Sequence, residues 1–160
     1  MSISKVALAG AGGNIGAPIL KELIDAGFEV TVLTRPDSAS TFPSAARVVK
    51  VDYDSESSLK DALSGQDALI STITTASVSQ QHKLVDVAIS AGVKRIIPSE
   101  FGSDTLNPDN RKLPVFGQKI AVQQQLEEKT KGTQTSYTYF INNVFLDVRI
   151  PVYTLSQTIS

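Results

Sequence analysis

Several kinds of chemistry are excluded because this chain of 160 residues lacks the residues they need. It has no cysteine, so it can form no disulfide, no thiol redox centre and no thiolate-bound zinc site. Its one histidine, His82, cannot build a multi-histidine metal site. The 15 basic and 16 acidic residues nearly cancel, which argues against nucleic acid or an anionic membrane surface as the main partner. With no signal peptide and no long apolar run, the expected compartment is the cytoplasm.

What the chain does contain is an alternation of apolar runs and amphipathic segments. Its length and ordinary composition indicate one domain over residues 1–160, and the alternation predicts an α/β fold with a doubly wound parallel sheet. We expect the Rossmann-type order 3-2-1-4-5-6, in which ligands bind outside the carboxyl ends of strands one and four. The strands are expected at residues 6–9, 29–34, 47–51, 67–71, 94–97 and 136–141. The helices are expected at 14–26, between 54 and 65, between 77 and 92, and at 114–130.

The most informative stretch is residues 5–16 (KVALAGAGGNIG), where an apolar run ends in glycines before an amphipathic pattern begins. Glycines let the main chain approach phosphates closely, and the first N–H groups of the next helix then face the anion. The spacing is G-x-x-G-x-x-G, whereas the commoner G-x-G-x-x-G would need glycine in place of Ile15. A plain tight turn is the alternative, but a strand before and a helix after favour a pyrophosphate site. The predicted loop comprises Gly10, Ala11, Gly12, Gly13, Asn14, Ile15 and Gly16.

A second nucleotide signal is Arg35, which follows the second expected strand about 20 positions past the glycines. A carboxylate there would hold the ribose hydroxyls of NAD, whereas a guanidinium can bind a 2′-phosphate with two parallel hydrogen bonds. Arg35 therefore predicts NADP(H) rather than NAD(H) as the cofactor. The alternative is a solvated arginine at a strand end, and Asp37 nearby weakens the case slightly.

Lys119 is the candidate catalytic residue. In the helix expected from residue 114, it shares an apolar stripe with Val115, Val122 and Leu126. A lysine on the face that packs against the sheet would be desolvated, and desolvation lowers the amine pKa toward values suited to proton transfer. The alternative is a lysine whose stem packs while its amine reaches water.

The tips of the fourth and fifth strands supply weaker candidates. Thr72 could bond ribose or pyrophosphate oxygens, or could simply belong to a helix-entry sequence. Phe101 could stack on a cofactor or substrate, or could equally fill the core. His82 is expected to be a solvated surface residue, and Asp52 and Asp54 are expected to be turn and cap residues.

Six features occur in order along the chain: GAGGNIG at 10–16, LTRP at 33–36, VDYDSESSL at 51–59, AGVKRIIPSEFGSD at 91–104, Lys119, and SYTYFINNVF at 136–145. This ordered set resembles the isoflavone reductase-like and NmrA-like group of atypical short-chain dehydrogenases. The resemblance implies an NADP(H)-binding Rossmann domain and, for the enzymes of the group, hydride transfer to small aromatic or phenolic compounds. It also implies that Lys119 is the proton-transfer residue.

The sequence departs from that group's pattern in several places. Val115 stands where a Y-x-x-x-K pair would have tyrosine, so tyrosine-based catalysis is not supported. Gln123 stands where similar reductases often carry arginine, and residues 38–46 contain no lysine to help hold a 2′-phosphate. The group usually continues into a further strand and a smaller substrate-binding region, whereas this chain stops at Ser160 with an atypical tail over 147–160. We therefore expect most of the substrate region to be missing.

Three functions stay open at this point. The first is an oxidoreductase that uses NADPH to reduce a small aromatic carbonyl or enone. The second is a non-catalytic, redox-sensing regulator that binds the dinucleotide without turnover. The third is a truncated, inactive family member. A shortened Rossmann unit could also expose apolar surface, and such surface promotes association, so a homodimer is a further hypothesis.

Overall fold

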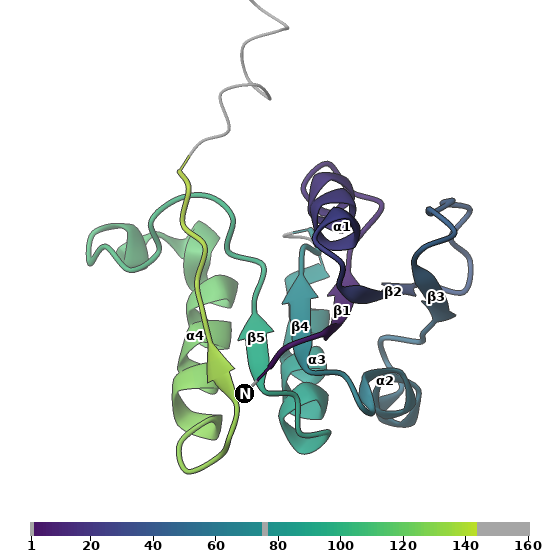
Figure 1. The fold of residues 1–160 in the computed structure, drawn as a ribbon. Helices are drawn as coiled ribbons and strands as arrows, with labels where there is room; N and C mark the ends of the chain where they lie inside the picture. The colour runs from purple at the N-terminus through teal and green to yellow at the C-terminus, as the bar shows by residue number, and fades with distance from the viewer. Residues whose placement is uncertain (1, 75–76, 144–160) are drawn as a thin grey trace, which may run out of the picture.

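The computed structural model describes residues 2–74 and 77–143 (Figure 1). The expected tail at 147–160, and residues 144–145 of the last motif, lie outside these ranges. The strands are β1 (Lys5–Ala9), β2 (Glu29–Thr34), β3 (Arg47–Lys50), β4 (Ala68–Ser71), β5 (Arg95–Ile97) and β6 (Ser136–Tyr137). The α-helices are α1 (Gly16–Asp25), α2 (Glu56–Leu63), α3 (Val78–Ser90) and α4 (Gly117–Lys129), with 3₁₀ turns η2 (Asn110–Lys112) and η3 (Pro114–Phe116). None of these described helices is long and apolar enough to cross a bilayer.

The six described strands form one sheet in the order β3-β2-β1-β4-β5-β6, and every neighbouring pair is parallel. This confirms the predicted Rossmann-type fold. Because the order reverses between β1 and β4, the connections that leave these two strands diverge at their carboxyl ends. Figure 1 shows β1, β4 and β5 pointing toward the same edge of the sheet, so the segments that follow them meet there.

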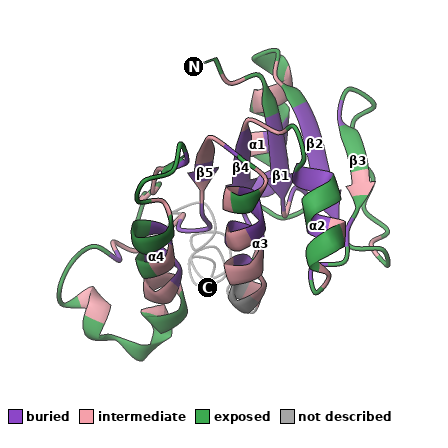
Figure 2. Ribbon diagram, turned by 90° about the horizontal axis from the view of Figure 1, so that it is seen from below, coloured by how far each residue is buried: buried purple, intermediate pink, exposed green. Residues whose placement is uncertain are grey.

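Apolar side chains cover both faces of the sheet. Strands β1, β2 and β4 are almost entirely buried, which explains why they are continuous apolar runs rather than alternating ones. One face packs against α2, α3 and α4 through a core that includes Leu59, Leu84 and Leu126. The other face packs against α1 through a core that includes Leu20 and Val32. Figure 2 shows the buried residues concentrated on the central strands, with the outer faces of the helices exposed.

Two expected elements begin or end three or more residues away from the predicted position. Residues 114–116 form the turn η3, so α4 begins at Gly117 rather than at Pro114. Val115 is therefore outside α4 and 67% exposed, and its expected place on the apolar stripe is wrong. Strand β6 covers Ser136–Tyr137 only, although the apolar run predicted a strand to residue 141, because its described pairing with β5 ends there.

Polar side chains link several of these elements. Ser55 caps α2 by accepting a hydrogen bond from the main-chain N–H of Ser58. The expectation that His82 is a solvated surface residue is wrong. His82 is half-buried, and its Nδ1 lies 2.5 Å from Oε1 of Gln125, so that it joins α3 to α4. The partner lies 43 positions away in the sequence, which no local pattern could indicate.

Candidate functional site

The turn between β1 and α1 depends on two glycines. Gly10 has a φ of +83°, in the left-handed region, and a Cβ there would lie 2.7 Å from the main chain of Thr72. Gly16 is buried beneath the loop, and a Cβ there would collide with the carbonyl oxygen of Gly10. Between them, Gly12 and Gly13 are exposed. The loop therefore presents bare main chain to solvent while it stays close to the tip of β4.

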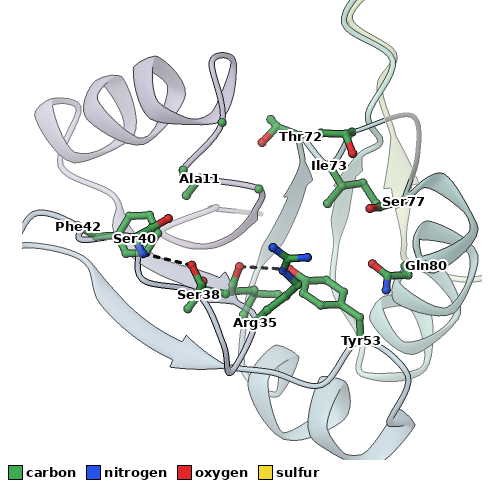
Figure 3. Close-up of a pocket in the computed structure, with 16 residues that line it drawn as sticks. Ala11, Arg35, Ser38, Ser40, Phe42, Tyr53, Thr72, Ile73, Ser77 and Gln80 are labelled. Atoms are coloured by element: carbon green, nitrogen blue, oxygen red, sulfur yellow. Dashed lines mark hydrogen bonds between the residues drawn. The ribbon is translucent and has the colours of Figure 1, made fainter.

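A cavity of about 310 Å³ lies over this loop (Figure 3). Its volume is within the usual range for small-ligand sites. The glycine loop, the end of β2, the segment after β2, the tip of β4 and the start of α3 all contribute to its walls. Figure 3 shows Arg35, Tyr53, Thr72 and Ser77 arranged around one opening, although they come from distant parts of the sequence. Among the predicted residues, those lining it are Gly10, Ala11, Gly12, Gly13, Arg35 and Thr72.

Arg35 follows β2 directly and lines this cavity beside Tyr53. Its side chain is 68% exposed, and its Nε is 3.8 Å from Oδ1 of Asp37, a contact too long and too solvated to hold the guanidinium firmly. Lys50 stabilises the turn that follows Arg35, because its Nζ donates to the carbonyl oxygens of Pro36 (2.7 Å) and Ser38 (3.2 Å). The turn is thus anchored, while the guanidinium that it carries is exposed to solvent.

Tyr53 forms part of the wall beside Arg35. Its ring is buried, and its hydroxyl donates to the carbonyl oxygen of Leu33 at 3.1 Å. Burial raises the pKa of Tyr53 to about 12, with a smaller opposing effect from the Arg35 charge. The phenol therefore stays neutral at ordinary pH and acts as a rigid apolar wall.

A second cavity, of about 230 Å³, adjoins the first. The two share Gly13 and residues 72–74. The second cavity extends toward α4 and the tip of β5, where Glu100, Phe101 and Lys119 line it. Asn14 and Ile15, also predicted as loop residues, line this second cavity, whereas Gly16 lines neither because it packs beneath the loop. All the other predicted site residues therefore border two adjacent cavities at the carboxyl edge of the sheet.

Thr72 is tied to the fold by its own hydroxyl. Its Oγ1 donates to the carbonyl oxygen of Ala9 at 2.9 Å, and its main-chain N–H donates to the same oxygen. A hydroxyl has one proton, so Thr72 can offer a ligand only its acceptor lone pairs in this arrangement.

Phe101 has an unusual main-chain conformation. Its φ is +23°, which is uncommon for a bulky side chain and marks local strain of the kind that clusters at functional sites. The ring stacks on Phe140 with centroids 6.0 Å apart and planes 7° from parallel, and it also packs against the apolar core under α1. Phe101 thus fills the edge of the core, as one of its two expected roles required, and it also lines the second cavity, while stacking on a cofactor or substrate stays a prediction.

Lys119 lies in the first turn of α4 and is half-buried. Its Nζ donates to the main-chain carbonyl oxygen of Glu100. Burial lowers the pKa of the Lys119 amine, and the negative charge of Glu100 partly opposes that shift. The amine is thus partly desolvated at the wall of the second cavity, beside Phe101.

Some polar residues of the site were not predicted. Glu100 is 1% exposed, and Gln81 and Gln123 are fully buried in α3 and α4. Gln81 accepts a hydrogen bond from the main-chain N–H of Ser99 at 2.8 Å and so fixes the tip of β5. The sequence gives no sign of their burial beyond their place beside predicted residues. In the described ranges, no group of three histidine, aspartate or glutamate side chains could hold a metal ion.

A parallel sheet with a bare glycine turn and two cavities at its switch point defines a Rossmann-type domain. The model of the NmrA-like family matches residues 2–158, and the chain belongs to that family. This confirms the resemblance drawn from the motifs.

Two curated relatives illustrate the match. The chain is 43% identical over 150 residues to the protein named Oxidoreductase aprR of Aspergillus flavus. The aligned region covers 91% of this chain and 50% of that protein. It is 30% identical over 161 residues to the bifunctional pinoresinol-lariciresinol reductase of Linum album, covering 89% of this chain and 48% of that one. The chain thus spans about half the length of the curated relatives it matches.

Solved structures give the same picture. The structure of AtPrR2 with NADP+ and (+)pinoresinol has a TM-score of 0.79 at 26% identity, covering 91% of this chain and 51% of that one. The binary complex of leucoanthocyanidin reductase with NADPH from Vitis vinifera has a TM-score of 0.72 at 25% identity. The match covers 88% of this chain and 50% of that one. Both of these solved structures contain NADP+ or NADPH.

Proposed function

We propose that this chain forms the NADP(H)-binding part of a reductase that acts on a small aromatic substrate. The observation that carries the proposal is the pair of adjacent cavities, which run from Arg35 across the glycine loop to Phe101 and Lys119. The nicotinamide of a bound cofactor would supply a hydride. The chain's own part is to bind the phosphates, to orient the ring and to offer a proton-transfer group.

The walls of the first cavity suit an anion. Its lining in the described chain includes Arg35 and several hydroxyls but no aspartate or glutamate. Helix α1 carries no acidic residue in its first turn, so its positive end is not neutralised from within. A 2′-phosphate at Arg35 and a pyrophosphate at the bare loop between Gly10 and Ile15 would both meet favourable charge. These features favour NADP(H) over NAD(H).

The second cavity suits the reacting end. Phe101 offers an aromatic face, and Lys119 offers an amine whose pKa is lowered by burial and which is held by the carbonyl of Glu100. Its proposed role is to hold or deliver a proton at Nζ. The reductase relatives, which include a pinoresinol-lariciresinol reductase, favour an aromatic compound as the substrate.

Binding and turnover test the proposal separately. The chain is titrated with NADPH and with NADH, and is then incubated with NADPH and a panel of quinones and enones while the absorbance of reduced nicotinamide is followed. We expect tighter binding of NADPH than of NADH, and turnover that is lost in Lys119→Ala. Binding without turnover on the panel would point instead to a dinucleotide-binding regulator. Failure of a folded sample to bind either cofactor would refute the proposal.

A further inference from the structure

A buried glutamate, Glu100, lines the second cavity together with Lys119. Glu100 is 1% exposed, and its Oε2 accepts a hydrogen bond from the hydroxyl of Thr105 at 2.7 Å. Its other oxygen, Oε1, has no hydrogen-bond partner within the described ranges. Burying a carboxylate without full compensation is costly, so such a group persists where a nearby positive charge or a function offsets the cost.

A chain of hydrogen bonds fixes the orientation of this carboxylate. Arg111 in η2 donates from Nη1 to Oε1 of Gln123 at 2.6 Å, and Gln123 donates from Nε2 to Oγ1 of Thr105 at 2.7 Å. Arginine cannot accept, so the amide of Gln123 must present its oxygen to Arg111 and its nitrogen to Thr105. The hydroxyl of Thr105 accepts from Gln123, and its single proton therefore goes to Glu100. The last donor of this relay, the Thr105 hydroxyl, therefore points toward Glu100, and a donor in this position stabilises the charged form of a carboxylate.

The same residue also holds Lys119. The Lys119 amine donates to the main-chain carbonyl oxygen of Glu100. The negative charge of the Glu100 side chain also favours the charged form of this amine and so raises its pKa, against the larger effect of burial. The titratable neighbours that face this region from packed elements are Glu100 at the tip of β5, Arg111 in η2 and Tyr139 after β6. Tyr139 donates to the carbonyl oxygen of Gln123 at 3.4 Å, and burial above all raises its pKa, so it stays neutral at ordinary pH. Of these groups, Glu100 is the one that favours a positive charge on Lys119.

We propose that Glu100 is a positioning residue of this site, whose carboxylate, oriented by the relay from Arg111, keeps Lys119 in place as an ammonium group beside Phe101. An ammonium group at this position can donate a proton, whereas a neutral amine can only accept one. Only the transfer of that proton to a substrate rests on the proposed function. The coupling between the two side chains is a property of the chain alone.

The test follows the Lys119 side chain directly. The chain is labelled with ¹³C and ¹⁵N in lysine, and the Lys119 signal is identified by its loss in Lys119→Arg and followed through a pH titration without cofactor. Glu100→Gln keeps the size of the side chain and an oxygen for Thr105 but removes the charge. We expect the Lys119 midpoint to fall by about one pH unit, a tenfold change in the protonation constant.

Two further variants make the result decisive. Asp109→Asn removes an exposed carboxylate from the same loop and should leave the Lys119 midpoint unchanged. Thr105→Val removes the hydroxyl that stabilises the charged carboxylate, so it should move the midpoint in the same direction as Glu100→Gln and serves if that variant does not fold. Unchanged midpoints in the folded variants would overturn the inference. NADPH titrations of the same samples test the proposed function independently, because the lysine readout needs no cofactor.

Discussion

Reversing the charge at Arg35 is the sharpest test of the cofactor assignment. Arg35 lines a cavity that has no aspartate or glutamate among its described walls, and its contact with Asp37, at 3.8 Å, is weak enough to break. A charge-assisted hydrogen bond is worth about 1.5–3 kcal/mol, and a like charge near a protein surface adds a repulsion of similar order. Solvent screens both contributions because the Arg35 side chain is 68% exposed, so Arg35→Glu should weaken NADPH binding by about 2–4 kcal/mol, roughly 30- to 1,000-fold.

The assay compares two cofactors that differ only in the 2′-phosphate. Dissociation constants for NADPH and NADH are measured by nicotinamide fluorescence or calorimetry at low and at physiological ionic strength. We expect NADH binding to change by less than about threefold, and the NADPH loss to shrink as salt screens the charges. Arg47→Glu is the matched control, because Arg47 is an exposed arginine on β3 that does not line either cavity. Equal losses for both cofactors in Arg35→Glu would refute the assignment.

Three further predictions follow from particular contacts. Lys50→Ala removes the amine that holds the carbonyls of Pro36 and Ser38, so the NADPH dissociation constant should rise several-fold while that for NADH stays the same. Gly16→Ala forces a side chain against the Gly10 carbonyl and should lower the free energy of unfolding in urea by about 1–3 kcal/mol. Gly117→Ala is the control, because its added methyl group would enter open space at a residue with a helical φ. This variant should not lower the free energy of unfolding. Asp67 is bonded by Lys94 and by the main-chain N–H groups of Ser4 and Lys5, which lower its pKa. That stabilisation is present above about pH 4 and is lost as pH falls below it, so acid unfolding should be less steep in Asp67→Asn.

The order of the sheet could be predicted because its signals are local. Each central strand is a short apolar run, and each helix that follows carries an apolar stripe, so the βα alternation can be recognised without knowledge of any tertiary contact. The exact ends of elements were harder to predict. The apolar run from residue 136 to 141 suggested a longer β6, and Pro114 suggested an earlier start for α4. Both ends depend on pairing and packing with distant parts of the chain.

The candidate site divides in the same way. The glycine loop and Arg35 could be predicted because a phosphate site needs a bare turn and a cation at fixed distances from a strand end. The surroundings of Lys119 could not. Val122 and Leu126 are buried and Lys119 is partly desolvated, as the stripe predicted, but Val115 is exposed, and the contact of Lys119 with the main-chain carbonyl of Glu100 was not predicted. A buried glutamate and a buried glutamine have no local pattern, because their burial depends on partners from other elements.

Two departures from the family pattern show why single positions mislead. Gln123 replaces a frequent arginine, yet Arg111 reaches Gln123 from η2, so a guanidinium still contacts this part of α4. Residues 38–46 lack a lysine, yet Lys50 at the end of β3 donates to the turn that carries Arg35. In both cases the cation comes from a segment that is distant in sequence and adjacent in the fold. When a motif lacks its usual lysine or arginine, a basic residue from a neighbouring element can therefore stand close to the same segment. The motif alone does not reveal such a residue.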